Sequence, residues 1–259
     1  EHRGALVLRG PGLSPNVTDS DPENEPSKIL EVKPTEDTAE AKKTAKILNA
    51  LTETSHKILK EQPLNLDRVN KKQKPANILI FRGAGTLPKI TPLTQMFKIN
   101  AACIIPTALV RGVAIAAGMK PIDVRGATGT VETDTVAKAK ALVKNLQNYD
   151  FFFIHVKGTD NASHDGNLKG KIHMIEKIDR MTKFLLDNLD LENVCITFTA
   201  DHATPLILRK HTGDQVPITI AGLGVIPDDV ESFSERACSK GGLGRIRGRH
   251  VIPIMMNLL

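Results

Sequence analysis

Five residues whose side chains commonly bind metal ions lie in, or shortly after, two short polar segments of this 259-residue chain. They are Asp160 and His164 in the segment KGTDNASHDG, Asp201 and His202 in the segment ADHATP, and His211 nine residues after His202. Asp160 and His164 are four residues apart, so on a helical turn both would face the same side and could bind one ion. Asp201 and His202 are adjacent, so on an extended turn they would point in opposite directions and could serve different ions.

The chemistry of this ligand set is that of a divalent metal centre. Carboxylate and imidazole ligands without a thiolate suit manganese, cobalt, zinc or magnesium. Two such ions about 3.5 to 4 Å apart form a clamp for phosphoryl transfer. Each of the five residues taken alone is more often a helix cap or a packed polar side chain, so the hypothesis rests on all five occurring together.

The elements that must position these residues are strands, because each polar segment follows an apolar run. Strands are predicted over residues 2–9, 77–81, 151–156, 194–199 and 216–221. Helices are predicted over residues 38–59, 133–146 and 169–189, where apolar positions recur with a helical period. The short apolar runs 101–105 and 115–119 are typical of an exchange between strand and helix. This alternation predicts an α/β fold with a mainly parallel sheet and helices on both faces. In such sheets ligands bind at the carboxyl ends of the strands, which is where both polar segments lie.

Composition narrows the class of protein. Hydrophobic residues make up 41% of the chain and charged residues 25%, as in a globular protein. The net charge of +6 could favour binding of an anionic partner. The aromatic content of 3% and the absence of Trp argue against nucleic-acid binding. No apolar run is long enough for a membrane span, and no signal peptide is seen. We therefore expect a soluble cytoplasmic protein that binds neither nucleic acid nor a membrane, and the sequence predicts no oligomeric state.

Longer motifs add a resemblance to a known family. The runs HVKGTDNASHDGNLKGKIHMIEKID, TADHATP and HTGDQVP, with EHRGALVLRGPGLS, NILIFRGAG and ATG before them and GGLGRIRG after them, occur in order along the chain. This pattern resembles the archaeal-type 2,3-bisphosphoglycerate-independent phosphoglycerate mutases of the alkaline phosphatase superfamily. The resemblance covers essentially the whole chain.

The resemblance implies a ligand assignment and a reaction. Asp160, His164 and His211 would bind one divalent ion, and Asp201 and His202 the other, with manganese as the first expectation. The reaction would interconvert 3-phosphoglycerate and 2-phosphoglycerate in glycolysis and gluconeogenesis, without bisphosphoglycerate. In the family a serine takes the phosphoryl group and returns it to the other hydroxyl of the glycerate, in a site closed to water.

The resemblance also implies a division of the chain. Residues 1–126 would be most of a smaller α/β domain, inserted in the metal-binding domain, that closes over the substrate. Residues 127–259 would be the C-terminal part of the alkaline-phosphatase-like domain. Arginine suits carboxylate and phosphate, so Arg82 is the first candidate for substrate binding and Arg3 and Arg9 are weaker ones.

One feature departs from the family pattern. The family's opening Asp-Gly motif is absent, and no serine occupies the position of the nucleophile, so the catalytic residue itself is unassigned. We expect the chain to lack the N-terminal segment and to be inactive alone. Three alternatives stay open: a metal-dependent phosphatase or mutase for another small phosphate ester, a non-catalytic binding module, and a basic nucleic-acid binder.

Overall fold

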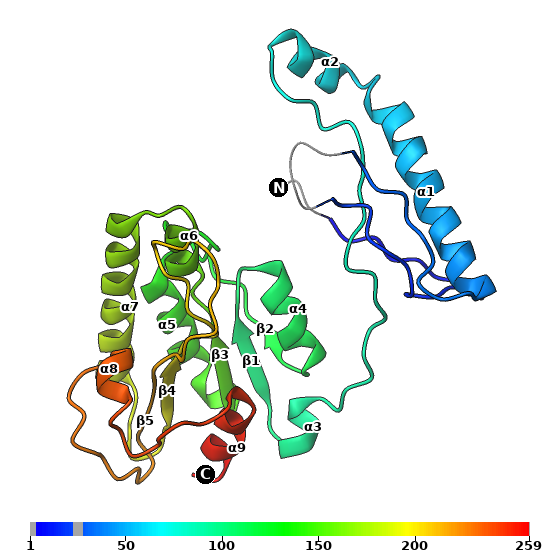
Figure 1. Cartoon of the computed structure of the whole chain (residues 1–259). Helices are drawn as coiled ribbons and strands as arrows, with labels where there is room; N and C mark the ends of the chain where they lie inside the picture. Colours follow the sequence, from blue (N-terminus) through cyan, green and yellow to red (C-terminus); the bar gives the residue numbers. More distant parts are fainter. Residues whose placement is uncertain (1–3, 23–27, 259) are drawn as a thin grey trace. The chain divides into compact units, whose positions relative to one another are not determined.

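The computed structural model describes residues 4–22 and 28–258, which form two compact units, Glu1–Lys89 and Ile90–Leu259 (Figure 1). The division between the units differs from the predicted domain boundary after residue 126. Residues 90–126 contain two strands, β1 (Ala101–Ile104) and β2 (Lys120–Pro121), that belong to the sheet of the second unit. The hydrogen bonds of β1 tie the segment before residue 126 to the strand Phe151–Ile154, which follows that boundary in the chain.

The first unit is built on one long helix, α1 (Ala39–Leu59), followed by the short α2 (Pro63–Asn70). Thr38 caps α1, since its hydroxyl accepts a hydrogen bond from the Ala41 amide. The apolar stripe of α1 packs, through Ala45 and Leu48, against Val17 and Val32. The helix predicted over residues 38–59 is therefore confirmed.

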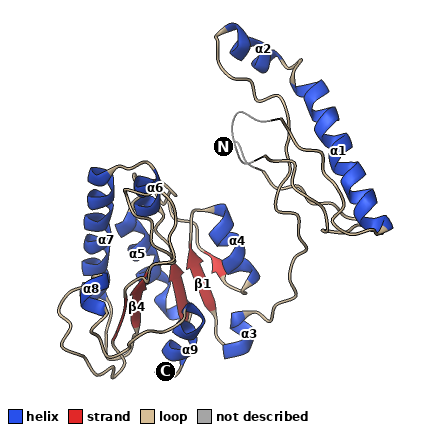
Figure 2. Ribbon diagram, in the orientation of Figure 1, coloured by secondary structure: helices blue, strands red, loops and turns tan. Residues whose placement is uncertain are grey.

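The described residues 4–9 form no strand, although one is predicted over residues 2–9. The strand predicted over residues 77–81 is wrong as well. Two serine hydroxyls take the place of a neighbouring strand: Ser55 Oγ accepts from the Leu79 amide and Ser20 Oγ from the Phe81 amide, at 3.0 and 2.7 Å. The Ser20 amide donates in turn to the Phe81 carbonyl. The segment thus satisfies its backbone without a β-ladder, and Figure 2 draws it as a loop.

The second unit contains a three-stranded parallel sheet in the order β2-β1-β3, where β3 is Phe151–Ile154. The central strand β1 is buried along its whole length. On one face Cys103 packs with Ala114 of helix α4 (Ala108–Ala116). On the other face Ile104 packs with Leu142 of α5 (Thr135–Asn145) and Leu185 of α7 (Leu168–Asn188). Successive residues of β1 therefore face opposite sides of the sheet, and helices cover both sides. The predicted α/β fold is confirmed.

The two remaining strands, β4 (Ile196–Thr199) and β5 (Ile218–Ala221), pair with each other and run antiparallel. They form a two-stranded sheet of their own, separate from the parallel sheet β2-β1-β3. The remaining short elements are α3 (Leu93–Phe97), η1 (Leu146–Asn148), α6 (Gly158–His164), α8 (Glu235–Cys238), η2 (Gly248–His250) and α9 (Val251–Met256). Over residues 4–22 and 28–258, no helix has the length and apolar character needed to cross a membrane.

Candidate metal centre

Helix α6 carries the first two candidate ligands and begins four residues after the end of β3. Asp160 lies in its first turn and His164 is its last residue. The helix packs closely on α7, because a Cβ at Gly158 would lie 2.8 Å from Met174 Sδ. With its inner side fixed in this way, α6 presents both ligands together, and Asp160 Oδ1 lies 3.4 Å from His164 Nε2. The predicted pairing at four-residue spacing is confirmed.

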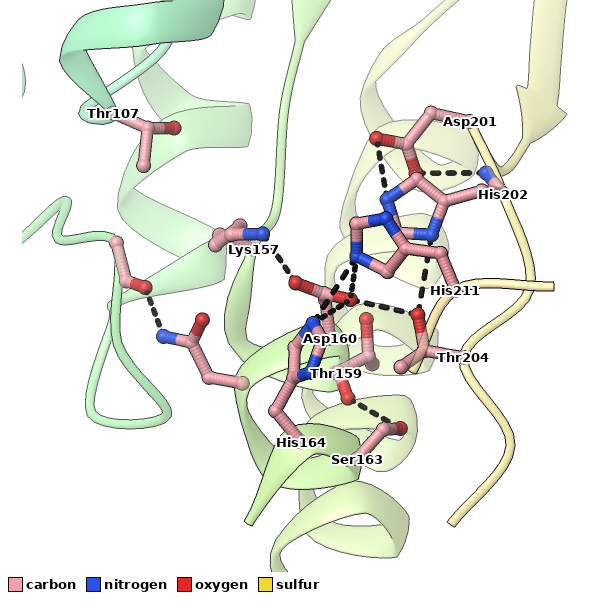
Figure 3. Close-up of polar contacts among 12 residues, drawn as sticks. Thr107, Lys157, Thr159, Asp160, Ser163, His164, Asp201, His202, Thr204 and His211 are labelled. Atoms are coloured by element: carbon pink, nitrogen blue, oxygen red, sulfur yellow. Dashed lines mark hydrogen bonds and ion pairs between the residues drawn. The ribbon is translucent and has the colours of Figure 1, made fainter. Parts of the chain in front are cut away.

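His211 completes a group of three. Its Nε2 lies 3.4 Å from Asp160 Oδ1 and 3.1 Å from His164 Nε2 (Figure 3). Within the described part of the chain, these three residues are the group whose ligand atoms gather as a metal site would require, all within 4.8 Å of one another. Ligand atoms about 2.05 Å from a tetrahedral ion are separated from each other by about 3.3 Å. The observed separations therefore fit one divalent ion, and we call these three residues the triad.

The ring of His164 is held in the orientation that metal binding requires. Its Nδ1 donates a hydrogen bond to the main-chain carbonyl of Arg209, at 2.9 Å. A neutral imidazole that carries its proton on Nδ1 keeps a lone pair on Nε2, which is the atom that faces the triad. This contact could not be predicted from residue types, because the partner is a backbone carbonyl.

The carboxylate of Asp160 is largely buried and is held in its charged form. Partial burial raises the pKa of this carboxyl, but hydrogen bonds from Lys157 and Thr204 and the charges of Lys157 and His164 outweigh it and lower the pKa to about 2. Lys157 forms an ion pair with Asp160 Oδ2, and Thr204 Oγ1 donates to Asp160 Oδ1 at 2.7 Å. Lys157 is therefore part of the centre. Its three-residue spacing from Asp160 is the signal that could have identified it.

Asp201 and His202 lie beside the triad. The ring of His202 stacks on the ring of His211, with centroids 3.7 Å apart. The expectation that the two adjacent side chains point in opposite directions is wrong, because His202 Nε2 lies 3.4 Å from Asp201 Oδ2. The Asp201 side chain is 68% exposed, so this pair offers an oxygen and a nitrogen at an open edge of the site.

His155, which follows β3, is not among the triad ligands. Its Nδ1 lies 3.2 Å from Thr107 Oγ1, and its carbonyl accepts a hydrogen bond from the buried Lys138. Burial lowers the pKa of His155, which favours the neutral ring. It is the packed polar residue that its position at the end of an apolar strand suggests.

The predicted substrate-binding arginines belong to the first unit. Arg82 Nη1 lies 3.4 Å from Asp21 Oδ2, and the Arg82 side chain is 52% exposed. Arg9 is also exposed. Arg3 lies outside the described residues. The turn after Arg82 is held by a hydrogen bond that the Gly83 amide donates to Asp19 Oδ1.

Comparison with known proteins agrees with the site. A protein of Methanocaldococcus jannaschii named 2,3-bisphosphoglycerate-independent phosphoglycerate mutase 1 is 46% identical over 257 residues, which is 99% of this chain and 62% of that protein. The solved structure of PH0037 protein from Pyrococcus horikoshii has a TM-score of 0.80 and 46% identity, and the match covers 84% of this chain and 57% of that one. A cofactor-independent phosphoglycerate mutase from Thermoplasma acidophilum has a TM-score of 0.66 and 30% identity, over 96% of this chain and 60% of that one.

These matches confirm the resemblance drawn from the motifs. The chain spans less than two thirds of the length of each of these relatives. A family model described as the metalloenzyme superfamily matches residues 22–258, which takes in all five candidate ligands. On this match and on the triad geometry, the chain belongs to the metalloenzyme superfamily.

Proposed function

We propose that this chain supplies the metal centre of a cofactor-independent phosphoglycerate mutase, which interconverts 3-phosphoglycerate and 2-phosphoglycerate in glycolysis and gluconeogenesis. The observation that carries the proposal is the convergence of Asp160, His164 and His211, whose ligand atoms lie within 4.8 Å of one another. The names of relatives at 46% and 30% identity support the choice of substrate. An enzyme with this role would act in the cytoplasm.

In this proposal the centre holds two divalent ions, manganese before cobalt, zinc or magnesium. The triad holds the first, and Asp201 and His202 contribute to the second. When bound, the ions would stabilise the negative charge of a phosphoryl group in transfer. Asp160 provides the charge that attracts them, and Lys157 balances that charge while the site is metal-free.

The remaining parts of the proposed reaction come from outside the centre. The nucleophilic serine of the family pattern matches none of the serines of this chain, so we assign it to the part of the relatives that the chain does not span. The first unit would form most of the domain that closes over the substrate and excludes water. Arg82 is the foremost residue for gripping the carboxylate or phosphate of the substrate there, with Arg9 and Arg3 as further candidates.

The test is an activity assay on the longest gene product that contains this chain. Conversion of 3-phosphoglycerate to 2-phosphoglycerate is measured with Mn²⁺ and without bisphosphoglycerate. The variant His211→Ala removes a triad ligand, and His173→Ala, on an exposed part of α7, is the matched control. We expect turnover that chelation and His211→Ala abolish and that His173→Ala leaves unchanged.

Two other outcomes would correct the proposal. Release of inorganic phosphate without formation of 2-phosphoglycerate would indicate a phosphatase on the same metal centre. Turnover that survives both chelation and His211→Ala would refute a role for the triad in the reaction.

A further inference from the structure

Thr204 is the one residue in the described chain whose side chain is hydrogen-bonded to a ligand from each half of the candidate centre. Its Oγ1 lies 2.7 Å from Asp160 Oδ1, in the triad, and 3.1 Å from Nδ1 of His202, in the second pair (Figure 3). The residue is 7% exposed, so water does not compete freely for these contacts. We propose that Thr204 is a positioning residue that links the two metal sites and sets the tautomer of His202; this inference rests on the metal centre of the proposed function.

The direction of the two hydrogen bonds follows from counting protons. A threonine hydroxyl has one proton to donate and can also accept. Thr204 Oγ1 donates to Asp160 Oδ1, so the one hydroxyl proton points to Asp160. The same hydroxyl oxygen then has to accept from His202, which places the ring proton of His202 on Nδ1.

This tautomer leaves a lone pair on His202 Nε2, the atom that lies 3.4 Å from Asp201 Oδ2. The two atoms are thereby presented together as a nitrogen and an oxygen ligand. His164 is prepared in the same way, since its Nδ1 donates to the Arg209 carbonyl. Both rings therefore offer Nε2 to a metal, one through a backbone acceptor and one through Thr204.

The backbone that carries the Thr204 side chain is itself held in place. The main-chain carbonyl of Thr204 accepts a hydrogen bond from Lys171 Nζ of α7, at 3.1 Å. Pro205 follows, and the residue before a proline is restricted to extended backbone conformations. Ala203, just before it, forms a β-bridge with Thr212, next to His211. A side chain fixed on both sides can transmit a change in the position of Asp160 to His202, and the reverse.

The experiment compares wild type, Thr204→Val and Thr204→Ser. Valine keeps the shape of threonine and removes the hydroxyl, whereas serine keeps the hydroxyl and is the matched control. Binding of Mn²⁺ alone is measured by calorimetry. We expect Thr204→Val to weaken binding about 10- to 100-fold, as loss of an outer hydrogen-bonding partner of a metal ligand does. Thr204→Ser should bind within about threefold of wild type.

The outcomes separate this inference from the proposed function. If wild type binds no Mn²⁺, the metal centre itself is refuted. If wild type and Thr204→Val bind equally well, the metal centre stands and the role of Thr204 is overturned.

A second measurement decides the matter even if Thr204→Val fails to fold. The ¹⁵N spectrum of the His202 ring in metal-free wild type at about pH 8 reports the tautomer directly. We expect the proton on Nδ1, retained in Thr204→Ser. A proton on Nε2 in wild type would overturn the inference.

Discussion

Lys138 offers a quantitative test of how the end of β3 is supported. Its side chain is fully buried, and its ammonium donates to the carbonyl of His155, at 2.9 Å. Burial lowers the pKa of Lys138 from 10.5 to about 8. Between these two values the unfolded chain binds more protons than the folded one, so the free energy of unfolding rises with pH. For Lys138 the rise amounts to about 2 kcal/mol between about pH 7 and about pH 9.5.

The assay is urea unfolding followed by circular dichroism, without metal, at about pH 7 and about pH 9.5. The variant Lys138→Met keeps the length of the side chain and removes the titrating group, so groups that titrate elsewhere cancel in the comparison. Between these two pH values the free energy of unfolding of wild type should rise by about 2 kcal/mol more than that of Lys138→Met. Lys144→Met, at an exposed position of the same helix, is the control, and its free energy of unfolding should rise as much as that of wild type. Parallel pH dependence in wild type and Lys138→Met would show that the buried ammonium is not the source of the effect.

Two further predictions concern the turn after β5 and the charge of Asp160. Gly222 and Gly224 both have positive φ, but a Cβ at Gly222 would lie 2.0 Å from the Val194 carbonyl, whereas Gly224 faces open space. Gly224→Ala should therefore cost about 1 kcal/mol in urea unfolding and Gly222→Ala several times more, and equal costs would contradict the close approach. Lys157→Met should raise the pKa of Asp160 from about 2, measured by ¹³C titration of its carboxyl without metal. The ionised Asp160 carboxylate stabilises the fold above its unfolded pKa of 3.8, and this stabilisation is lost as the pH falls toward 2. In Lys157→Met the loss of stability should begin at a higher pH. An unchanged pKa of Asp160 in this variant would contradict the role of Lys157.

The fold could be predicted where local pattern and packing agree. The helical period of residues 38–59 correctly indicated α1. Residues 77–81 have the apolar character of a strand, but Ser20 and Ser55 satisfy their amides, and no local pattern reveals a partner more than 20 residues away. The division between the units was placed too late for a similar reason, because the parallel pairing of β1 with β3 joins segments about 50 residues apart.

The site was predicted as far as residue type and spacing reach. The spacing of Asp160 and His164 gave their shared face directly, and the residue types gave the class of metal. The groups that orient the ligands were not predicted, because they act through long-range contacts. Thr204 bonds to Asp160 across 44 residues, and the Arg209 carbonyl that holds His164 has no signature in any side chain.

The central claim is that the triad binds a divalent metal, and a crystal grown with Mn²⁺ tests it most directly. The anomalous difference map of the manganese should show a peak about 2.1 Å from Asp160 Oδ1, His164 Nε2 and His211 Nε2. A second peak beside Asp201 and His202 would support the two-metal proposal. A map with no peak at the triad, at a Mn²⁺ concentration that saturates binding in solution, would contradict the account.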